Sequence, residues 1–545
     1  MEQRNAISAV KEKLKQMLSH RYAGFFIVIT VIIARIIQQI YFFNTRNDMT
    51  YQVLAAQHLL DGHGISYASI AANDLSHIFY QPLNQWPPGF SVLFIPFYIL
   101  LGKNYIAAAL ALGIFCAILL IVTSRAILKL LEVPGYLINL FTILSGFFGY
   151  YFYTKCCTDA IGISFLLIAF YYSLLLIKKS GSLTKNILLL TTSLLICGFI
   201  KYLFMPAVLV IPFFLIAKGI AAKESPLKKA GAISFFVLLI AFGAFFLYQQ
   251  NISGSVGYVK EQGRGFFPEN LKATFPFITG SFIKPDSHEQ FFPLQAGKYF
   301  FQIISVAFFA VLLFFFLKGL VQNHLKKQCI RNDFFYLSFF VSSVIISLLV
   351  FLSLRVAKEP IDQEQFWTYV EEPRYYGIIT VLLHIGVFAL YPWYKSTKKV
   401  FLKYLFPVLI LFMIPEMIRG FAFTANRFSR INREKYGWQY ELQFQKKINQ
   451  IISNLSEKGK NRMIILYGTS DWFTLRAGLY SHIPILKESL KKINSQELKT
   501  TKPVTVLAII GKDDFNQNKH FISSESVRSE GNGYGFFFYS FDINP

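Results

Sequence analysis

The chain has 545 residues, of which 54% are hydrophobic and only 15% are charged, and its formal net charge is +24. A soluble protein of ordinary composition carries about 25% charged residues, so this composition excludes a typical soluble enzyme and indicates an integral membrane protein. Nucleic acid is not the expected partner of the positive charge, because most Lys and Arg residues lie between apolar runs, where the positive-inside rule places them. Anionic membrane lipids and phosphate-bearing substrates fit this distribution better.

The first predicted element is a membrane span at about 22–43. It follows the basic segment VKEKLKQMLSHR, which predicts a cytoplasmic N-terminus under the positive-inside rule. The apolar run is long enough to cross a bilayer, begins after about twenty polar residues and has no small-residue cleavage site. We therefore expect a retained span rather than a removed signal peptide.

A long external loop, 44–103, is predicted to follow the first span. In this loop Asp48 opens an amphipathic helix that the glycines of DGHG close. The apolar segment at 87–102 keeps only about 13 residues between its two prolines and its final glycine, a helix of roughly 20 Å against about 30 Å of hydrocarbon. We expect a half-inserted or surface helix there, within a loop that builds a cavity.

Apolar runs of span length then alternate with basic clusters, which we place on the cytoplasmic side. Such runs suit helices, whose backbone polar groups are satisfied within each segment, and not the alternating strands of a barrel. The predicted fold class is an all-α polytopic membrane protein of about eleven spans, with the C-terminus outside. The predicted spans are 22–43, 104–124, 135–153, 160–177, 186–200, 203–217, 230–249, 297–317, 334–354, 375–393 and 400–421.

The residues after 421 differ in character from the spans. YELQFQKKINQIISNL has helical periodicity, whereas RMIILYG, TVLAIIG and YGFFFYSFDI are typical of buried strands. We therefore predict a transmembrane domain, 1–421, that includes the first loop, and a small periplasmic α/β domain, 422–545. No catalytic motif is evident in this second domain, and YGTSDW at 467–472 is interpreted as a strand-to-helix turn.

Two carboxylates are the main candidates for chemistry. Asp48 follows the first span, and Asp159 precedes the fourth, so both are predicted at the external edge of the membrane. Each has a structural explanation as a helix N-cap, with Thr158 competing for the second position. A charge at the bilayer centre costs about 2.5–3.5 kcal/mol on insertion scales, which favours the membrane edge for Asp159. Two separate loops that place carboxylates on one side favour a shared catalytic site.

External cations beside spans run against the positive-inside bias and are candidates for binding a phosphate group. Lys201 breaks an apolar run where one predicted span ends and the next begins, and an interfacial Lys that snorkels is the alternative. Glu371 and Glu372 precede Arg374, so a local ion pair is the alternative there. The candidates are Lys201, Lys260, Arg264 and Arg374.

Other polar residues of the first loop are candidates for contacts with an acceptor substrate. These are Tyr51, Asp61 and His63. The five cysteines form no CxxC motif and no His-spaced pair, so neither a zinc site nor a disulfide framework is predicted.

The order of these motifs resembles a known family. An Asp just beyond the first span, then YQVLAAQHLLDGHGIS and WPPGFSVLFIPFYILLG, is similar to polyprenyl-phosphate-sugar-dependent glycosyltransferases of the GT-C fold. That bacterial group includes protein O-mannosyltransferases and the lipid A aminoarabinose transferase. TDAIGISFLLIAFYYSLLL, LLICGFIKYLFMPAVLVIPFF and EEPRYY resemble later motifs of the same family. The mannosyltransferases have an Asp-Glu pair where this chain has Asn47-Asp48, which argues against protein mannosylation.

The resemblance implies a sugar donor linked to a polyprenyl phosphate and a periplasmic glycan, lipid or protein acceptor, in a bacterial inner membrane. It implies that Asp48 acts as the base and that Lys201 and Arg374 contact the donor phosphate. Asp159 would orient the acceptor or, with Asp48, hold a divalent metal; no cofactor is certain. If a carboxylate is the base and the acceptor attacks the free face of the donor sugar, inversion at the anomeric carbon is expected.

Three other functions stay open from the sequence. A transporter or flippase for polyprenyl-linked sugars would place charges and broken helices near the membrane middle, where this chain has few charged residues. A ligase or polymerase of lipid-linked glycans would also catalyse glycosyl transfer, but its external loops would be arranged differently. An assembly protein would use the C-terminal residues to bind partners.

Overall fold

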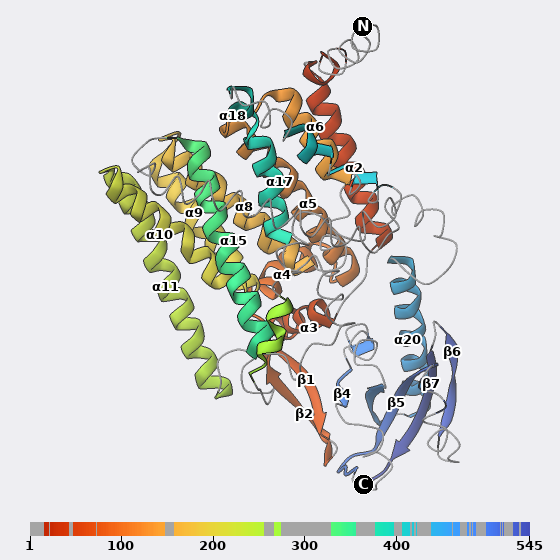
Figure 1. Cartoon of the computed structure of the whole chain (residues 1–545). Coiled ribbons are helices and arrows are strands. Elements are labelled where there is room, and N and C mark those ends of the chain that lie inside the picture. Colours follow the sequence, from red (N-terminus) through yellow and green to blue (C-terminus); the bar gives the residue numbers. More distant parts are fainter. Residues whose placement is uncertain are drawn as a thin grey trace. The chain divides into compact units, whose positions relative to one another are not determined.

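The protein is described from a computed structural model (Figure 1), which divides into two compact units. The helical unit consists of residues 1–39 and 112–429, and the sheet unit consists of residues 40–111 and 430–545. The structure describes residues 13, 16–20, 22–42, 47–71, 73–147, 157–254, 266–273, 329–355, 377–396, 406–411, 413–414, 417–418, 421, 438–459, 461–468, 477–478, 481, 483–486, 498–512, 514, 516, 527–533 and 536–545.

The helical unit is built from long apolar helices that alternate in direction along the chain. In Figure 1, α8, α9, α10, α11 and α15 run side by side, and each of them packs against at least two of the others. The described helices are α2 (Ala23–Phe42), α5 (Tyr105–Leu130), α6 (Gly135–Phe147), α8 (Cys157–Ile177), α9 (Leu183–Ile200), α10 (Phe204–Ala221), α11 (Ser225–Ser253), α15 (Ile330–Arg355), α17 (Gly377–Ala389) and α18 (Tyr391–Ser396), with the 3-10 helix η2 (Pro268–Ala273).

Seven described helices are long and apolar enough to cross a membrane, so the chain is a multi-pass membrane protein. They are α2, α5, α8, α9, α10, α11 and α15. Two more predicted spans correspond to α6 and α17, which have 13 residues each and are shorter than a typical span. The predicted span 297–317 lies outside the described residues, and 400–421 lies only partly within them. The count of eleven therefore stays a prediction.

Small residues bring the helices of this unit close together. A Cβ atom on Gly162 of α8 would overlap the ring of Phe204, at the start of α10. A Cβ atom on Gly198 of α9 would likewise overlap the ring of Phe242 on α11. Glycine at these two positions lets four helices approach at one end of the unit, as small residues do in other membrane proteins.

The sheet unit combines the first loop with the C-terminal residues. Its helices are α3 (Asn47–Leu60), α4 (Gly89–Leu100) and α20 (Trp438–Lys458). Its strands are β1 (Ser66–Ala71), β2 (Asp74–Pro82), β3 (Met463–Gly468), β4 (Ile485–Leu486), β5 (Val504–Gly511), β6 (Arg528–Gly533) and β7 (Phe536–Ile543). The three strands predicted from RMIILYG, TVLAIIG and YGFFFYSFDI are confirmed as β3, β5 and β7.

The strands form one seven-stranded sheet in the order β2-β1-β4-β3-β5-β7-β6. Its centre is parallel, because β4 pairs in parallel with β1 and β3, and β3 pairs in parallel with β5. The outer pairs are antiparallel. The amphipathic helix α20 contacts β3 and buries one face, on which Phe444, Ile448, Ile451 and Leu455 recur at helical spacing.

Two strands of this sheet come from the first loop, and sequence reasoning missed both. The hairpin β1–β2 is joined to the C-terminal residues by backbone pairing of Ile70 with Leu486 and by a hydrogen bond from Leu75 N to Lys499 O of 2.9 Å. The hydroxyls of Ser76 and Thr500 lie 3.0 Å apart and add a further bond. The compact units thus differ from the two predicted domains, because long-range strand pairing ties the loop to the tail.

The predicted helices of the first loop are present. The helix that opens near Asp48 is α3, and the apolar segment after the two prolines is α4, with 12 residues. One face of α4 packs on α3 through Phe90, Phe94 and Tyr98, whereas Leu100 is 81% exposed. A short helix that is apolar on both faces fits a surface or half-inserted position, and its depth stays a prediction.

Candidate active site

The structure brings together two of the predicted site residues. Lys201 Nζ donates a hydrogen bond to Asp159 Oδ1 across 2.7 Å, so the two side chains form an ion pair. The Asp159 side chain is fully buried, and the Lys201 side chain is 15% exposed. Only the lysine of the pair is therefore partly exposed.

Local structure explains the positions of both residues. Asp159 lies in the first turn of α8, where the helix dipole stabilises negative charge. Lys201 is the C-cap of α9 and has extended backbone angles, so it ends the helix before the short turn into α10. The chain runs from one span through a short turn into the next span. This turn places the Lys201 cation at the same end of the helical unit as the start of α8.

The structural alternatives from the sequence were a helix N-cap for Asp159 and an interfacial, snorkelling side chain for Lys201. Asp159 Oδ1 accepts from Lys201, and Asp159 Oδ2 is buried without a hydrogen-bond partner among the described residues. Neither oxygen therefore caps α8. Lys201 reaches toward a carboxylate rather than only toward the membrane surface, so snorkelling alone does not explain it.

Side chains around the pair hold it in a packed environment. Phe204 packs over Gly162, one turn beyond Asp159, and Cys197 Sγ lies 3.2 Å from Gly162 O. Next to Lys201, Tyr202 accepts a hydrogen bond from Gln249 Nε2 at 2.7 Å.

Sequence reasoning missed Tyr202 and Gln249. The signal for Gln249 was available, because the predicted apolar span 230–249 ends on this polar residue and Gln250 follows it.

Asp48 and Tyr51 belong to the sheet unit. Asp48 lies in the first turn of α3 and is partly exposed, and Gln52 Nε2 donates to its backbone oxygen at 2.9 Å. Tyr51 is half-buried one turn further along the same helix. The predicted pairing of Asp48 with Asp159 in one site joins the two units and stays a prediction.

Asp61 and His63 lie in the exposed turn that closes α3. His63 N donates to His58 O at 2.8 Å, and positive φ angles at Gly62 and Gly64 let the chain turn sharply here. The His63 ring stacks on Tyr80 with centroids 3.7 Å apart. These contacts explain why the segment DGHG ends α3. A role of Asp61 and His63 in binding the acceptor stays a prediction.

Three predicted phosphate-binding residues lie outside the described part of the chain. They are Lys260, Arg264 and Arg374, and the local pair of Arg374 with Glu371 or Glu372 lies there as well. Their roles stay predictions.

A divalent metal has no evident site among the described residues, where no three His, Cys, Asp or Glu side chains come together. Asp159, one of the two predicted ligands, already faces the Lys201 ammonium at 2.7 Å. A metal at this carboxylate would have to displace that ammonium, so the surroundings of Asp159 fit an ion pair better than a metal site.

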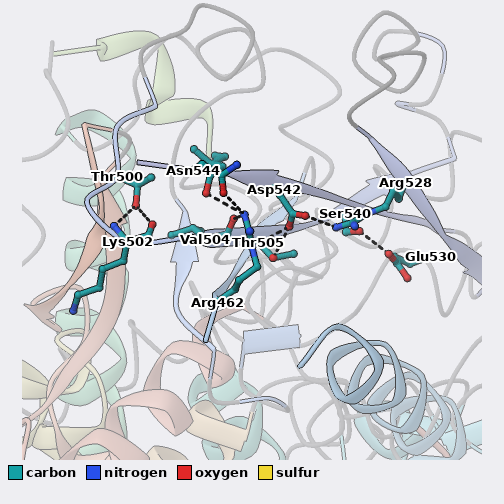
Figure 2. Close-up of polar contacts among 11 residues, drawn as sticks. Arg462, Thr500, Lys502, Val504, Thr505, Arg528, Glu530, Ser540, Asp542 and Asn544 are labelled. Atoms are coloured by element: carbon teal, nitrogen blue, oxygen red, sulfur yellow. Dashed lines mark hydrogen bonds and ion pairs between the residues drawn. The ribbon is translucent and has the colours of Figure 1, made fainter. Parts of the chain in front are cut away.

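A second polar cluster lies on the sheet unit (Figure 2). Asp542 accepts from Thr505 at 2.6 Å and from Arg528 at 2.8 Å, and Arg462 Nε lies 3.4 Å from the same carboxylate. Arg462 also donates to the backbone oxygen of Ile543. These groups join β5, β6 and β7 to the residue before β3, and each carboxylate oxygen of Asp542 has a partner. The cluster therefore serves to hold the sheet together.

Comparisons with known proteins identify the fold. No family model matches the chain, and no curated protein matches it. The crystal structure of ArnT from Cupriavidus metallidurans in the apo state matches with a TM-score of 0.53 at 11% identity, covering 95% of this chain and 97% of that chain. The structure of the same ArnT bound to undecaprenyl phosphate matches with a TM-score of 0.52 at 10% identity and the same coverage.

A weaker match is the oligosaccharyltransferase from Archaeoglobus fulgidus in the apo form, with a TM-score of 0.48 at 8% identity, covering 92% of this chain and 71% of that chain. This similarity is too low to support an inference. The match to ArnT spans nearly both chains and shows the fold: the protein is a multi-pass membrane protein with the GT-C fold. The resemblance to GT-C proteins that the sequence indicated is therefore confirmed for the fold.

Proposed function

We propose that the protein is an integral membrane glycosyltransferase that moves a sugar from a polyprenyl-phosphate donor to a periplasmic acceptor. The observation that carries the proposal is the match to ArnT along 95% of this chain, since one ArnT structure contains undecaprenyl phosphate. The orientation follows from the basic clusters, with the N-terminus in the cytoplasm of a bacterium and the C-terminus in the periplasm.

In the proposed reaction, an acceptor hydroxyl or amine attacks the anomeric carbon of the donor sugar. Asp48 removes the acceptor proton as the new bond forms, and the bond from the anomeric carbon to the phosphate oxygen breaks. The polyprenyl phosphate leaves with the electron pair, and attack from the opposite face inverts the anomeric centre. The balance is one proton to Asp48 and one negative charge to the leaving phosphate.

The Asp159–Lys201 pair is proposed to serve the leaving phosphate. Negative charge develops on the phosphate as the bond breaks, and a fixed cation stabilises that charge without reorganisation. Asp159 holds the Lys201 ammonium at 2.7 Å at the edge of a membrane helix. This geometry supports Asp159 as a positioning residue for Lys201, beside the earlier prediction that it orients the acceptor.

Replacement of Asp48 tests the proposal. Asn caps a helix about as well as Asp but cannot accept a proton, so Asp48→Asn should lower transfer from a labelled polyprenyl-phosphate sugar by about 10²–10⁴-fold while expression and donor binding persist. Asp74→Asn, in the same loop, is the matched control and should keep full activity. If Asp48→Asn retains more than about a tenth of the activity, Asp48 is a cap and not the base.

The same assay separates the alternative functions. A transporter or flippase would move the lipid-linked sugar without consuming it, and an assembly protein would leave it unchanged. A ligase or polymerase would transfer a whole lipid-linked glycan rather than one sugar. Loss of the single-sugar donor together with appearance of free polyprenyl phosphate distinguishes a glycosyltransferase from all three.

A further inference from the structure

Three aromatic side chains of the sheet unit form a continuous group that the proposed mechanism does not use. The rings of Tyr51 and Trp86 are stacked, with centroids 5.7 Å apart and an interplanar angle of 26°. The ring of Tyr67 meets Tyr51 edge-on at 5.5 Å and 69°. We call Tyr51, Tyr67 and Trp86 the aromatic platform. All three side chains are half-buried, so part of the group faces outward.

The platform is distinct from the packing core of the loop. Where α4 packs on α3, Phe90 and Phe94 are fully buried and Tyr98 is 3% exposed. Those rings form their own stack, with centroid distances of 5.9 Å and 5.7 Å. The loop thus has an enclosed aromatic core and, as a second aromatic group, the half-buried platform.

Three separate elements build the platform beside the candidate base. Tyr51 comes from α3, Tyr67 from β1, and Trp86 from the turn before α4. Tyr51 follows Asp48 by three positions on α3, and residues three apart lie on the same helix face. The platform is therefore anchored on the face of α3 that carries Asp48.

Polar groups border the aromatic rings. The Tyr67 hydroxyl donates to Gln81 Oε1 at 2.6 Å, and this bond lies at the exposed surface of the hairpin. Asp48, three positions before Tyr51 on α3, is half-buried and adds a carboxyl group to the same helix face. Apolar ring faces with hydrogen-bonding groups at their edge match a sugar, whose ring has an apolar C–H face and hydroxyl groups around its rim.

We propose that the aromatic platform binds a pyranose ring of the acceptor, so that the acceptor is a carbohydrate rather than a peptide or a simple amine. This inference rests on the proposed function, because it assigns the platform to the acceptor through its position next to Asp48. The ring would stack on Tyr51 and Trp86 and present one hydroxyl toward the Asp48 carboxylate. The new glycosidic bond would form at that hydroxyl, and its proton would pass to Asp48.

The experiment measures carbohydrate binding without any donor. The full-length protein in detergent is applied to an array of bacterial envelope oligosaccharides built from hexoses, hexosamines and heptoses. The variants are Tyr51→Leu, Trp86→Leu and the conservative Trp86→Phe. The control is Tyr248→Leu, because Tyr248 is an exposed tyrosine on α11, in the helical unit. Thermal unfolding of each variant reports whether it folds.

The wild-type protein should bind at least one pyranose-containing glycan. Tyr51→Leu and Trp86→Leu should each weaken binding about tenfold, the equivalent of about 1.4 kcal/mol. Trp86→Phe, which keeps a stacking ring, should stay within about threefold, and Tyr248→Leu should bind like the wild type. If Trp86→Leu fails to fold, Tyr51→Leu still decides the matter.

Two results would overturn the inference: no glycan is bound, or the platform variants bind as well as the wild type. The same variants are also tested for binding to anionic lipid vesicles that contain no other protein. If they lose vesicle binding but keep glycan binding, the rings contact the membrane surface instead, and the inference is overturned as well. Failure of the proposed function looks different. Platform-dependent glycan binding with no consumption of any polyprenyl-phosphate sugar would leave the platform standing and reject the glycosyltransferase.

Discussion

The helical unit pairs a lysine with an aspartate at each end of α10, and the two pairs differ in how far their side chains are exposed. The pair Lys201–Asp159 spans 2.7 Å, and its lysine side chain is 15% exposed. The pair Lys218–Asp333 spans 2.6 Å, and both of its side chains are 2% exposed. The same two residue types thus form a partly open pair at one end and an enclosed pair at the other.

The enclosed pair belongs to a set of contacts that ties helix ends together. Lys218 lies in the last turn of α10 and Asp333 in the first turn of α15, so each charge also complements its helix dipole. At the same end, Arg331 Nη2 contacts Glu132 at 3.2 Å, and Lys179 contacts Glu224 at 3.2 Å. The open pair lies instead in a short turn. The comparison indicates that one end fixes the bundle and that the other is available for chemistry.

The largest expected effect comes from breaking the enclosed pair. Lys218→Met leaves the Asp333 carboxylate buried without its cation, and removal of one partner from a buried ion pair costs about 3–5 kcal/mol. The thermal midpoint of the purified protein in nanodiscs should fall sharply, with a matching loss of expression.

The double variant Lys218→Met with Asp333→Leu is the control, because replacing both partners by apolar groups is often neutral or stabilising. It should recover most of the lost stability. A single variant as stable as the wild type would show that this pair does not fix the bundle.

An intermediate effect is expected from Gly162, one turn from the open pair. A Cβ atom at this position overlaps the Phe204 ring, and overpacking of this kind costs about 1–3 kcal/mol. Gly162→Ala should displace α10 from α8 and lower transfer activity more than its stability loss explains. Gly162→Ala combined with Phe204→Leu makes room for the methyl group and should restore activity. Activity that stays low in the double variant would mean that Phe204 itself is required.

Lys201→Met should separate binding from stability. Loss of a charge-assisted contact to a phosphate is worth roughly 1.5–3 kcal/mol, so the donor KM should rise about tenfold or more. Lys201→Met also leaves a buried carboxylate, that of Asp159, without its cation, so some stability should be lost as well; the contrast with Lys218→Met lies in the donor KM, which only Lys201→Met should raise. Donor kinetics and thermal midpoints measured on both methionine variants check this contrast. A large stability loss with an unchanged KM would make Lys201 structural, like Lys218.

The sequence identified two of the four residues in this comparison as site candidates, but it predicted neither ion pair. Asp159 and Lys201 were identified because charges at the ends of apolar runs are costly and local in sequence. Lys218 and Asp333 were not, because they are 115 positions apart and nothing local indicates that they pair. Within the sheet unit, β3, β5 and β7 were evident as apolar runs, whereas β1 and β2 were not.

The hairpin was missed for a physical reason. Residues 77–81 of β2 are exposed on both faces, so the strand lacks the alternation of buried and exposed residues that marks a strand in sequence. The place of the hairpin in the sheet depends on the pairing of its other strand, β1, with β4, more than 400 positions away along the chain. Similarly, the platform of Tyr51, Tyr67 and Trp86 comes from three elements whose proximity only the fold defines.

The smallest expected effect belongs to an exposed pair of the sheet unit, which extends the comparison of open and enclosed pairs. Asp74 Oδ2 lies 2.6 Å from His77 Nδ1, and this hydrogen bond, with a weaker one from Ser76 N, holds the pKa of the Asp74 carboxyl below its ordinary value. A carboxyl with a lowered folded pKa stabilises the fold above its unfolded pKa, about 3.9 for Asp, and loses that contribution as the pH falls through the folded value.

Asp74→Asn removes this pH-dependent contribution. The thermal midpoints of the wild type and of Asp74→Asn should differ slightly at pH 5.5, by about a degree or less as for other exposed pairs. The difference should shrink toward pH 3, because the wild-type carboxyl then becomes protonated and loses the same interaction. Thermal unfolding at both pH values checks this, with His77→Gln as the matched control that removes the partner instead. A difference that grows as the pH falls would contradict the lowered pKa, and a difference as large as that of Lys218→Met would contradict the ranking of enclosed over exposed pairs.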